Sequence, residues 1–182
     1  MEHGAPASAR DHEGMNMLKE LIDLLTCREL DPEELASLVA TIEGAADDPD
    51  LDWMDDPSPE ELIQNALVFK LVNHLAVGDK IDEVHEQISD FFAEPLADFP
   101  RHANGRWYLP DEYFAWLDPL LAERGKDGGG YQLFLLDDSF SDQLNALLVW
   151  RKDAARVLEL AGELALSIEP STQRPLGHRP IM

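Results

Sequence analysis

Apolar residues recur at intervals of three and four along the first two thirds of the chain, which is typical of amphipathic helices. Asp31 and Ser58 each precede a proline and two glutamates, a pattern that favours the start of a helix. The helix after Ser58 is apolar on almost every side, so we expect it to be a central helix that neighbours bury. The predicted helices span about residues 15–29, 31–44, 58–77, 80–92 and 111–124.

The period of the pattern changes after Gly128, Gly129 and Gly130, which we interpret as a flexible joint. Two short runs that follow, 131–136 and 144–150, are apolar and rich in aromatic residues, and a polar segment joins them. This pattern predicts a β-hairpin with a longer loop. Asp153 is expected to cap the next helix, and residues 166–169 are a candidate third strand.

We therefore predict an α+β fold in a single domain, residues 14–169. Its mainly helical N-terminal two thirds, 14–124, would pack with a small C-terminal sheet of ββαβ type, 131–169. Residues 1–13 lack periodicity and are expected to form a flexible arm. Residues 170–182, with three prolines, are expected to form a flexible tail.

The C-terminal third also resembles a known family. The resemblance lies in the helix end Leu-Leu-Ala-Glu-Arg-Gly at 120–125, the strand Tyr-Gln-Leu-Phe-Leu-Leu-Asp at 131–137, the Ser-Asp loop at 141–142, the strand that ends at Trp150 and the helix 153–164. Over about residues 110–169 the chain is similar to a family of uncharacterised bacterial α+β proteins. In that family the helix leads directly into the strand, whereas this chain inserts residues 126–130. Because the family has no assigned activity, the resemblance implies a fold and no catalytic residue.

The chain is strongly acidic, and its charge is unevenly distributed. Asp and Glu number 37 against 14 Lys and Arg, which gives a net charge of −23. Residues 1–100 hold 25 acidic and 5 basic residues, a net of −20, while the rest hold 12 and 9, a net of −3. Such a field repels nucleic acids and anionic lipids and attracts basic proteins. The alternative interpretation is a surface adapted to solubility or high salt, without a partner.

The densest acidic segment is residues 47–57, which we call the acidic loop. Its first aspartates have the spacing of an EF-hand, but Trp53 and Pro59 stand where a calcium loop requires glycine and glutamate. We therefore predict no calcium site of this type, and no other metal or cofactor. We expect Trp53 to be partly buried and its acidic neighbours to form the most negative exposed patch, which would bind a partner: Asp48, Asp50, Asp52, Asp55 and Asp56.

The other candidate site lies on the predicted central helix. Lys70, Asn73 and His74 share one face at helical spacing, and this polar stripe is either the wall of a ligand pocket or the solvent-facing edge of the helix. His85 is expected to be a core or boundary histidine with one hydrogen bond. Cys27, the single cysteine, can form no intramolecular disulfide and lies among leucines, where a thiol is inert.

No motif for a catalytic nucleophile, a phosphate-binding loop or a zinc site is present in the sequence. The leading hypothesis is therefore a non-enzymatic protein that binds a basic partner, as an immunity-type inhibitor or a nucleic-acid mimic would. The alternative is a small-ligand binder or enzyme with a pocket near Lys70, Asn73 and His74. The sequence contains no apolar stretch of membrane-spanning length and no secretory signal, so we expect a cytoplasmic protein without membrane contacts. It does not predict an oligomeric state.

Overall fold

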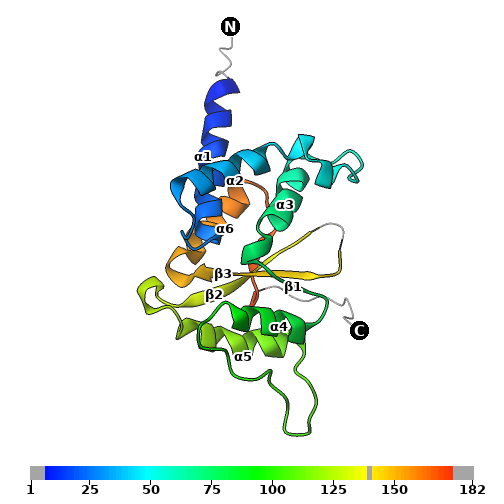
Figure 1. Ribbon diagram of the computed structural model, residues 1–182, viewed down its shortest axis with the longest axis vertical. Coiled ribbons are helices and arrows are strands. Elements are labelled where there is room, and N and C mark those ends of the chain that lie inside the picture. Colours follow the sequence, from blue (N-terminus) through cyan, green and yellow to red (C-terminus); the bar gives the residue numbers. More distant parts are fainter. Residues whose placement is uncertain (1–6, 139–140, 174–182) are drawn as a thin grey trace.

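A sheet lies between two layers of helices in the computed structural model, which describes residues 7–138 and 141–173 (Figure 1). On one side of the sheet lie α1 (Ala7–Leu25), α3 (Pro59–Lys70) and α6 (Ala154–Glu163), with α2 (Pro32–Glu43) packed on α1 and α3. The other face is covered by α4 (Ile81–Asp90) and α5 (Pro110–Ala122). The predicted α+β class, with a mainly helical N-terminal part and a C-terminal sheet, is confirmed.

The sheet has four antiparallel strands in the order β1-β3-β2-β4. The predicted hairpin is formed by β2 (Tyr131–Leu136) and β3 (Leu144–Trp150), and the candidate third strand is β4 (Ile168–Pro170). An additional short strand, β1 (Ala76–Gly78), pairs with β3. The prediction that the central helix continues to residue 77 was therefore wrong. The helix stops at Lys70, and residues 76–78 form backbone hydrogen bonds with the edge of β3 instead. Helical periodicity in the sequence cannot indicate this pairing, because it depends on a distant strand.

The central strands are apolar on both faces because helices cover both. Phe134 and Leu136 of β2 point into a core formed with α1, α2, α3 and α6. Leu133 and Leu135 alternate with them and point into a second core formed with α4 and α5. Residues of β3 alternate in the same way, with Leu147 in the first core and Ala146 in the second.

Several helix ends follow the predicted chemistry, and others do not. Asp31 and Ser58 each form a capping box with the glutamate three residues later. Asp153, by contrast, makes no capping hydrogen bond, because its carboxylate pairs with Arg28 at the end of α1. Helix α1 begins at Ala7, so residues 7–13 of the expected arm are helical. Pro170 lies in β4, and residues 1–6 and 174–182 of the expected arm and tail lie outside the described residues.

The three glycines before β2 form a packed turn, and the expectation of a flexible joint was wrong. A side chain at Gly128 would overlap the Trp150 ring, with its Cβ 1.7 Å from the nearest ring carbon. Gly130 has a φ of +91° and passes so close to Ala122 that a Cβ would lie 2.3 Å from its carbonyl oxygen. These positions are glycine because other groups already occupy the space of a side chain.

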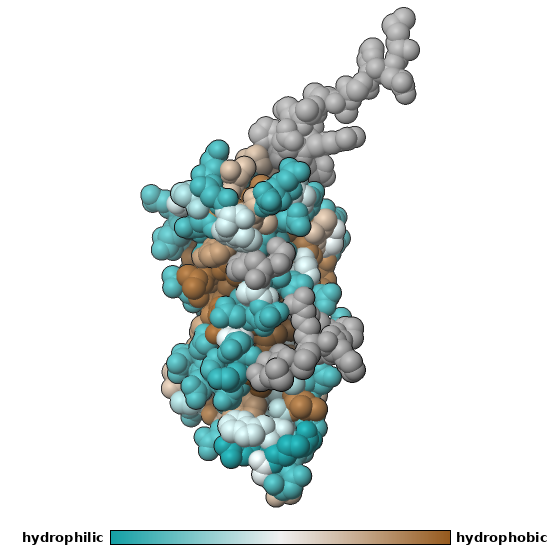
Figure 2. Space-filling view, turned by 90° about the vertical axis from the view of Figure 1, so that its right-hand side faces the viewer, coloured by the Kyte–Doolittle hydropathy of each residue, from teal (hydrophilic) through white to brown (hydrophobic). Residues whose placement is uncertain are grey.

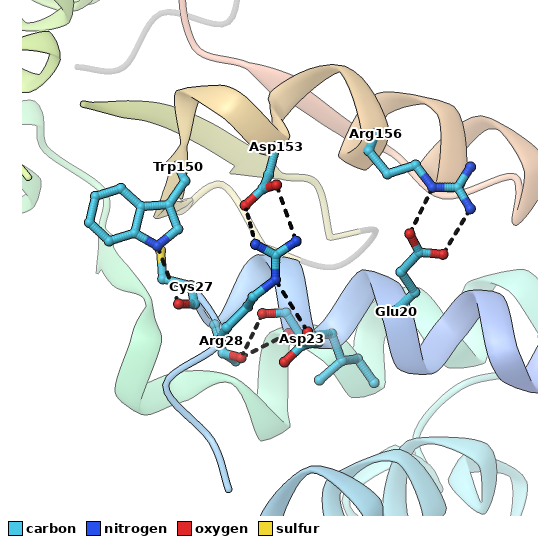
Figure 3. Close-up of polar contacts among 9 residues, drawn as sticks. Glu20, Asp23, Cys27, Arg28, Trp150, Asp153 and Arg156 are labelled. Carbon is cyan, nitrogen blue, oxygen red and sulfur yellow. Dashed lines mark hydrogen bonds and ion pairs between the residues drawn. The ribbon is translucent and has the colours of Figure 1, made fainter. Parts of the chain in front are cut away.

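Two arginine–carboxylate pairs connect α1 and the turn after it with α6 and the 3₁₀ turn that precedes α6 (Figure 3). Arg156 donates through two nitrogens to the Glu20 carboxylate, at 2.9 and 2.8 Å, and this hydrogen bonding lowers the pKa of Glu20. Arg28 makes a second two-pronged contact with Asp153, at 2.9 and 3.2 Å. Such paired contacts fix the direction of the two side chains, so they hold the end of α1 against the segment that leads from β3 into α6.

The first turn of α5 gives a pH-dependent contribution to stability. The Glu112 carboxylate accepts the Leu109 N–H at 2.7 Å and lies 3.1 Å from the His102 ring nitrogen; with a further effect of Arg106, these contacts lower the Glu112 pKa from 4.5 to about 2. Because the folded pKa is the lower one, the contribution is complete above pH 4.5 and is lost as the pH falls toward 2.

We therefore expect Glu112→Gln to be less stable than the wild type at neutral pH, with a difference that shrinks as the pH falls below 4.5. Urea unfolding at a series of pH values measures this difference. Asp111→Asn, which removes one charge from the same turn, controls for the loss of charge alone. A difference for Glu112→Gln that is constant from neutral to acidic pH would contradict the assignment.

Candidate interaction surface

The acidic loop is anchored to the core by its apolar residues. A short 3₁₀ turn, Ala45–Asp47, leads into the loop, and a second, Pro49–Leu51, lies within it. Leu51 is buried and Met54 packs against the core, so the loop backbone follows the protein surface. The Asp48 carboxylate accepts the Asp50 N–H at 3.0 Å and caps the second turn. The loop that connects α2 with α3 therefore has a defined conformation.

Lys70 at the end of α3 fixes the first half of the acidic loop. Its Nζ lies 2.7 Å from a carboxylate oxygen of Asp48 and 3.0 Å from one of Asp50. Hydrogen bonding to Lys70, followed by that to the Asp50 N–H, lowers the Asp48 pKa, and the two aspartates raise the Lys70 pKa. The Asp48 side chain is only 10% exposed, against 62% for Asp50. The expectation that Asp48 lies on an exposed patch was therefore wrong, because this aspartate is held beneath the loop by a lysine.

The second half of the loop is open to solvent. Asp52, Asp55 and Asp56 are exposed, and their carboxylates have no hydrogen-bond or ion-pair partner among the described residues. Trp53 is 50% exposed, and its indole N–H donates to the Asp50 carbonyl at 2.9 Å. Trp53, for which partial burial was predicted, is thus one of the exposed large apolar residues of the described chain. This half of the loop presents an oriented aromatic ring among carboxylates.

A hollow of about 180 Å³ lies at the N-terminal end of α3, into which the acidic loop leads. We call it the acidic hollow. Within it, Gln64 connects α3 to the sheet, since its side chain donates to the Asp137 carbonyl at 2.6 Å and accepts the Ser167 N–H at 2.9 Å. The hollow is lined by Glu60, Glu61, Gln64, Asn65, Asp137, Asp138, Ala165 and Ser167.

Glu61 and Asp138 use their carboxylates in structural hydrogen bonds. Glu61 accepts the Ser58 N–H at 2.8 Å, and Asp138 accepts from Ser141 and Asn145, also at 2.8 Å. Glu60 is exposed and is available to a ligand. Within the part of the chain that the structure describes, no group of three or more histidines, cysteines or acids is arranged to hold a metal ion. The acidic residues on both edges of the hollow suit a cationic group.

The sequence reasoning missed this hollow because its two acidic edges lie far apart in the chain. Gln64 and the Asp137 carbonyl it contacts are 73 residues apart, and Ser167 lies on a third segment. Each edge does carry a local signal, namely two adjacent acids at the start of a helix or the end of a strand. Only the tertiary fold brings the two pairs together.

The stripe of Lys70, Asn73 and His74 does not form one pocket. Lys70 points to the acidic loop, whereas Asn73 and His74 line a different cavity, together with Cys27 and Tyr131. The stripe separates because α3 ends at Lys70 and a 3₁₀ turn, Val72–His74, changes the direction of the chain. Asn73 and His74 therefore line a cavity, but Lys70 does not belong to it.

His85 and Cys27 have the environments expected of structural residues. His85 is buried, its Nδ1 lies 3.1 Å from the Tyr113 hydroxyl, and burial lowers its pKa. The prediction of a core or boundary histidine is confirmed by this burial, but His85 has more than the one hydrogen bond expected, because it also bonds to the backbone of Ala97. Burial also raises the pKa of the Cys27 thiol to about 12, and the thiol donates to the Leu148 carbonyl at 3.3 Å. Cys27 is thus protonated at neutral pH, as an inert thiol would be.

Removal of Lys70 is expected to loosen the acidic loop. In Lys70→Met the aspartates at 48 and 50 repel each other without a cation between them, so the Tm should fall by about 2–4 °C. The matched control is Lys80→Met, which removes an exposed lysine paired only with Glu83 and should change the Tm by less than about 1 °C. Calorimetry measures both. Equal Tm values for the two variants would mean that Lys70 does not hold the loop.

No family model, curated protein or solved structure matches this chain. The resemblance of residues 110–169 to uncharacterised bacterial proteins therefore stays a prediction. None of the helices in the described part of the chain combines the length and apolar composition needed to cross a membrane.

Proposed function

We propose that this protein is a non-catalytic binding protein whose acidic loop and acidic hollow recognise a basic surface on a partner protein. The observation that carries the proposal is the arrangement of the loop, in which exposed carboxylates surround an oriented, half-exposed Trp53. Figure 2 shows a face on which hydrophilic residues predominate and apolar residues reach the surface between them. A charged rim around an aromatic residue is the usual composition of a binding site for a cationic partner.

The anchoring of the loop supports binding energetically. Lys70 neutralises part of the charge of Asp48 and Asp50, and the buried Leu51 fixes the backbone, so little conformational freedom remains to be lost on association. The acidic residues of the open half of the loop and Glu60 are exposed, so a partner can reach their carboxylates. An arginine of the partner could then stack on Trp53 while a neighbouring basic side chain enters the hollow.

The partner class follows from the charge. A net charge of −23 raises the rate of encounter with basic proteins and opposes the approach of nucleic acids. Basic surfaces of this kind occur where proteins bind nucleic acids, so the protein would act as an immunity-type inhibitor or a nucleic-acid mimic by covering such a surface. Both versions require the same contact chemistry.

Two variants with equal net charge test the proposal. Asp52→Asn/Asp55→Asn/Asp56→Asn removes three charges from the acidic loop, and Glu86→Gln/Asp90→Asn/Glu94→Gln removes three exposed charges from α4 and the segment after it. Immobilised wild type and variants are exposed to a lysate of the source cell at about 50 mM salt, and bound proteins are eluted with about 500 mM salt and identified.

We expect the wild type and the α4 variant to retain the same basic protein and the loop variant to lose it. Equal loss in both variants would show attraction by net charge alone and would overturn the proposed surface. Absence of any retained protein, together with unfolding of the wild type at low salt, would favour the alternative of a surface adapted to high salt.

A further inference from the structure

A second cavity, of about 170 Å³, lies where the end of α1 meets the sheet, away from the acidic loop. Segments from four parts of the chain meet there: the turn after α1, the 3₁₀ turn after α3, the end of α4 and the hairpin of β2 and β3. Its lining includes Cys27, Glu29, Asn73, His74, Phe92 and Tyr131.

The wall formed by the turn after α1 has an unusual backbone. Cys27 and Arg28 are consecutive residues with positive φ, +53° and +59°, a conformation that non-glycine residues adopt rarely. The turn is held by the Trp150 indole, which donates to the Cys27 carbonyl at 3.2 Å, and by the contact of Arg28 with Asp153 (Figure 3). Such conformations persist where the surroundings enforce them, and they often occur at binding sites.

The opposite wall is aromatic and rigid. The Tyr131 ring stacks on Trp150 at 4.1 Å between centroids, and the Phe92 ring meets Tyr131 edge to face at 5.7 Å. Phe91 is 41% exposed. Arg124 lies over Phe92, but it donates to the backbone carbonyls of Glu94 and Pro95 and does not line the cavity. The cavity thus offers aromatic surface to an apolar group.

The polar side chains of the cavity are available to a ligand. Glu29, Asn73 and His74 have no hydrogen-bond or ion-pair partner through their side chains among the described residues. Thr26 and Cys27, in contrast, already donate to backbone carbonyls. Among the described lining residues, Glu29 contributes the carboxylate and none is a lysine or arginine, so the site favours a cation over an anion.

We propose that this cavity binds a small amine, in which an ammonium group is attached through a short chain to an aromatic ring. The ring would lie against Phe92 and Tyr131, and the ammonium group would reach Glu29, with Asn73 and His74 as further polar contacts. The volume suits the aromatic ring, because a cavity of about 150 Å³ accommodates benzene, and the chain with its ammonium group would extend toward the exposed Glu29. This binding is independent of the partner surface, since no lining residue belongs to the acidic loop or the acidic hollow.

Three compounds with the same ring but different charge test the proposal: 2-phenylethylamine, 2-phenylethanol and phenylacetate. Calorimetric titration of the full chain is expected to show the amine binding at least about 10-fold more tightly than the alcohol, and phenylacetate more weakly than either. Amide NMR signals of Cys27, Asn73 and His74 should shift with the amine, while those of Asp52 and Asp55 should not.

The exposed Glu29 also provides a variant that should fold normally. Glu29→Gln is expected to bring amine and alcohol to within about twofold of each other, whereas Glu43→Gln, an exposed acid on α2, should keep the preference. Equal affinities of the wild type for amine and alcohol, no binding of any compound, or an unchanged preference in Glu29→Gln would each overturn the proposal. The Asp52→Asn/Asp55→Asn/Asp56→Asn variant should bind the amine normally, which separates this result from that of the partner surface.

Discussion

Gly128→Ala is expected to destabilise the protein by about 3 kcal/mol, although it adds a single methyl group. The new Cβ would lie 1.7 Å from a ring carbon of Trp150, so either the turn or the ring must move. The ring cannot move freely, because it stacks on Tyr131 and donates to the Cys27 carbonyl. Urea unfolding followed by fluorescence or circular dichroism measures the loss.

The matched control is Gly129→Ala. Gly129 has a φ of +75°, and no atom lies within 4 Å of the position that a Cβ would take, so its replacement should cost only the conformational strain, about 1–2 kcal/mol. If Gly128→Ala lost no more stability than Gly129→Ala, the segment would be the flexible joint that its composition suggests and not a packed turn.

Gln64→Leu is expected to cost about 3 kcal/mol, even though the two side chains are similar in size. The glutamine is 8% exposed and accepts the Ser167 N–H while donating to the Asp137 carbonyl. Leucine would leave both backbone groups without this partner at the junction of α3 with the sheet, where these hydrogen bonds are partly buried, and polar groups that lose their partner away from water are costly.

The conservative variant separates packing from hydrogen bonding. Gln64→Glu keeps an acceptor for the Ser167 N–H but has no donor for the Asp137 carbonyl, so its stability at neutral pH should also be lower than that of the wild type. Thermal unfolding of both variants makes the comparison. A leucine variant within about 0.5 kcal/mol of the wild type would show that Gln64 does not connect these elements.

The features that the sequence predicted correctly are those that depend on neighbours in the chain. The helix starts at Pro32 and Pro59 need only a cap and a glutamate three residues later, and both capping boxes are present. The β-hairpin likewise follows from two apolar runs joined by a polar segment. Strand β1 depends on the edge of β3, almost 70 residues later, and its residues therefore extend a helical pattern in the sequence.

Of the candidate site, too, the sequence predicted only what depends on neighbouring residues in the chain. The acidic loop is visible as a run of aspartates around Trp53. The burial of Asp48 was not expected, because it depends on an ion pair with Lys70 at the far end of α3. The glycine turn shows the same limit, since its packing against Trp150 involves a residue 22 positions later in the chain and its composition resembles that of a linker.

The most direct test of the proposed function is the affinity for the retained basic protein as a function of salt. Titrations from about 50 to 500 mM salt would compare the wild type with the two variants of equal net charge. We expect the affinity of the wild type and the α4 variant to fall steeply with salt, and the loop variant to bind at least about 10-fold more weakly at low salt with a shallower dependence. Equal affinities of the two variants at every salt concentration would contradict the account.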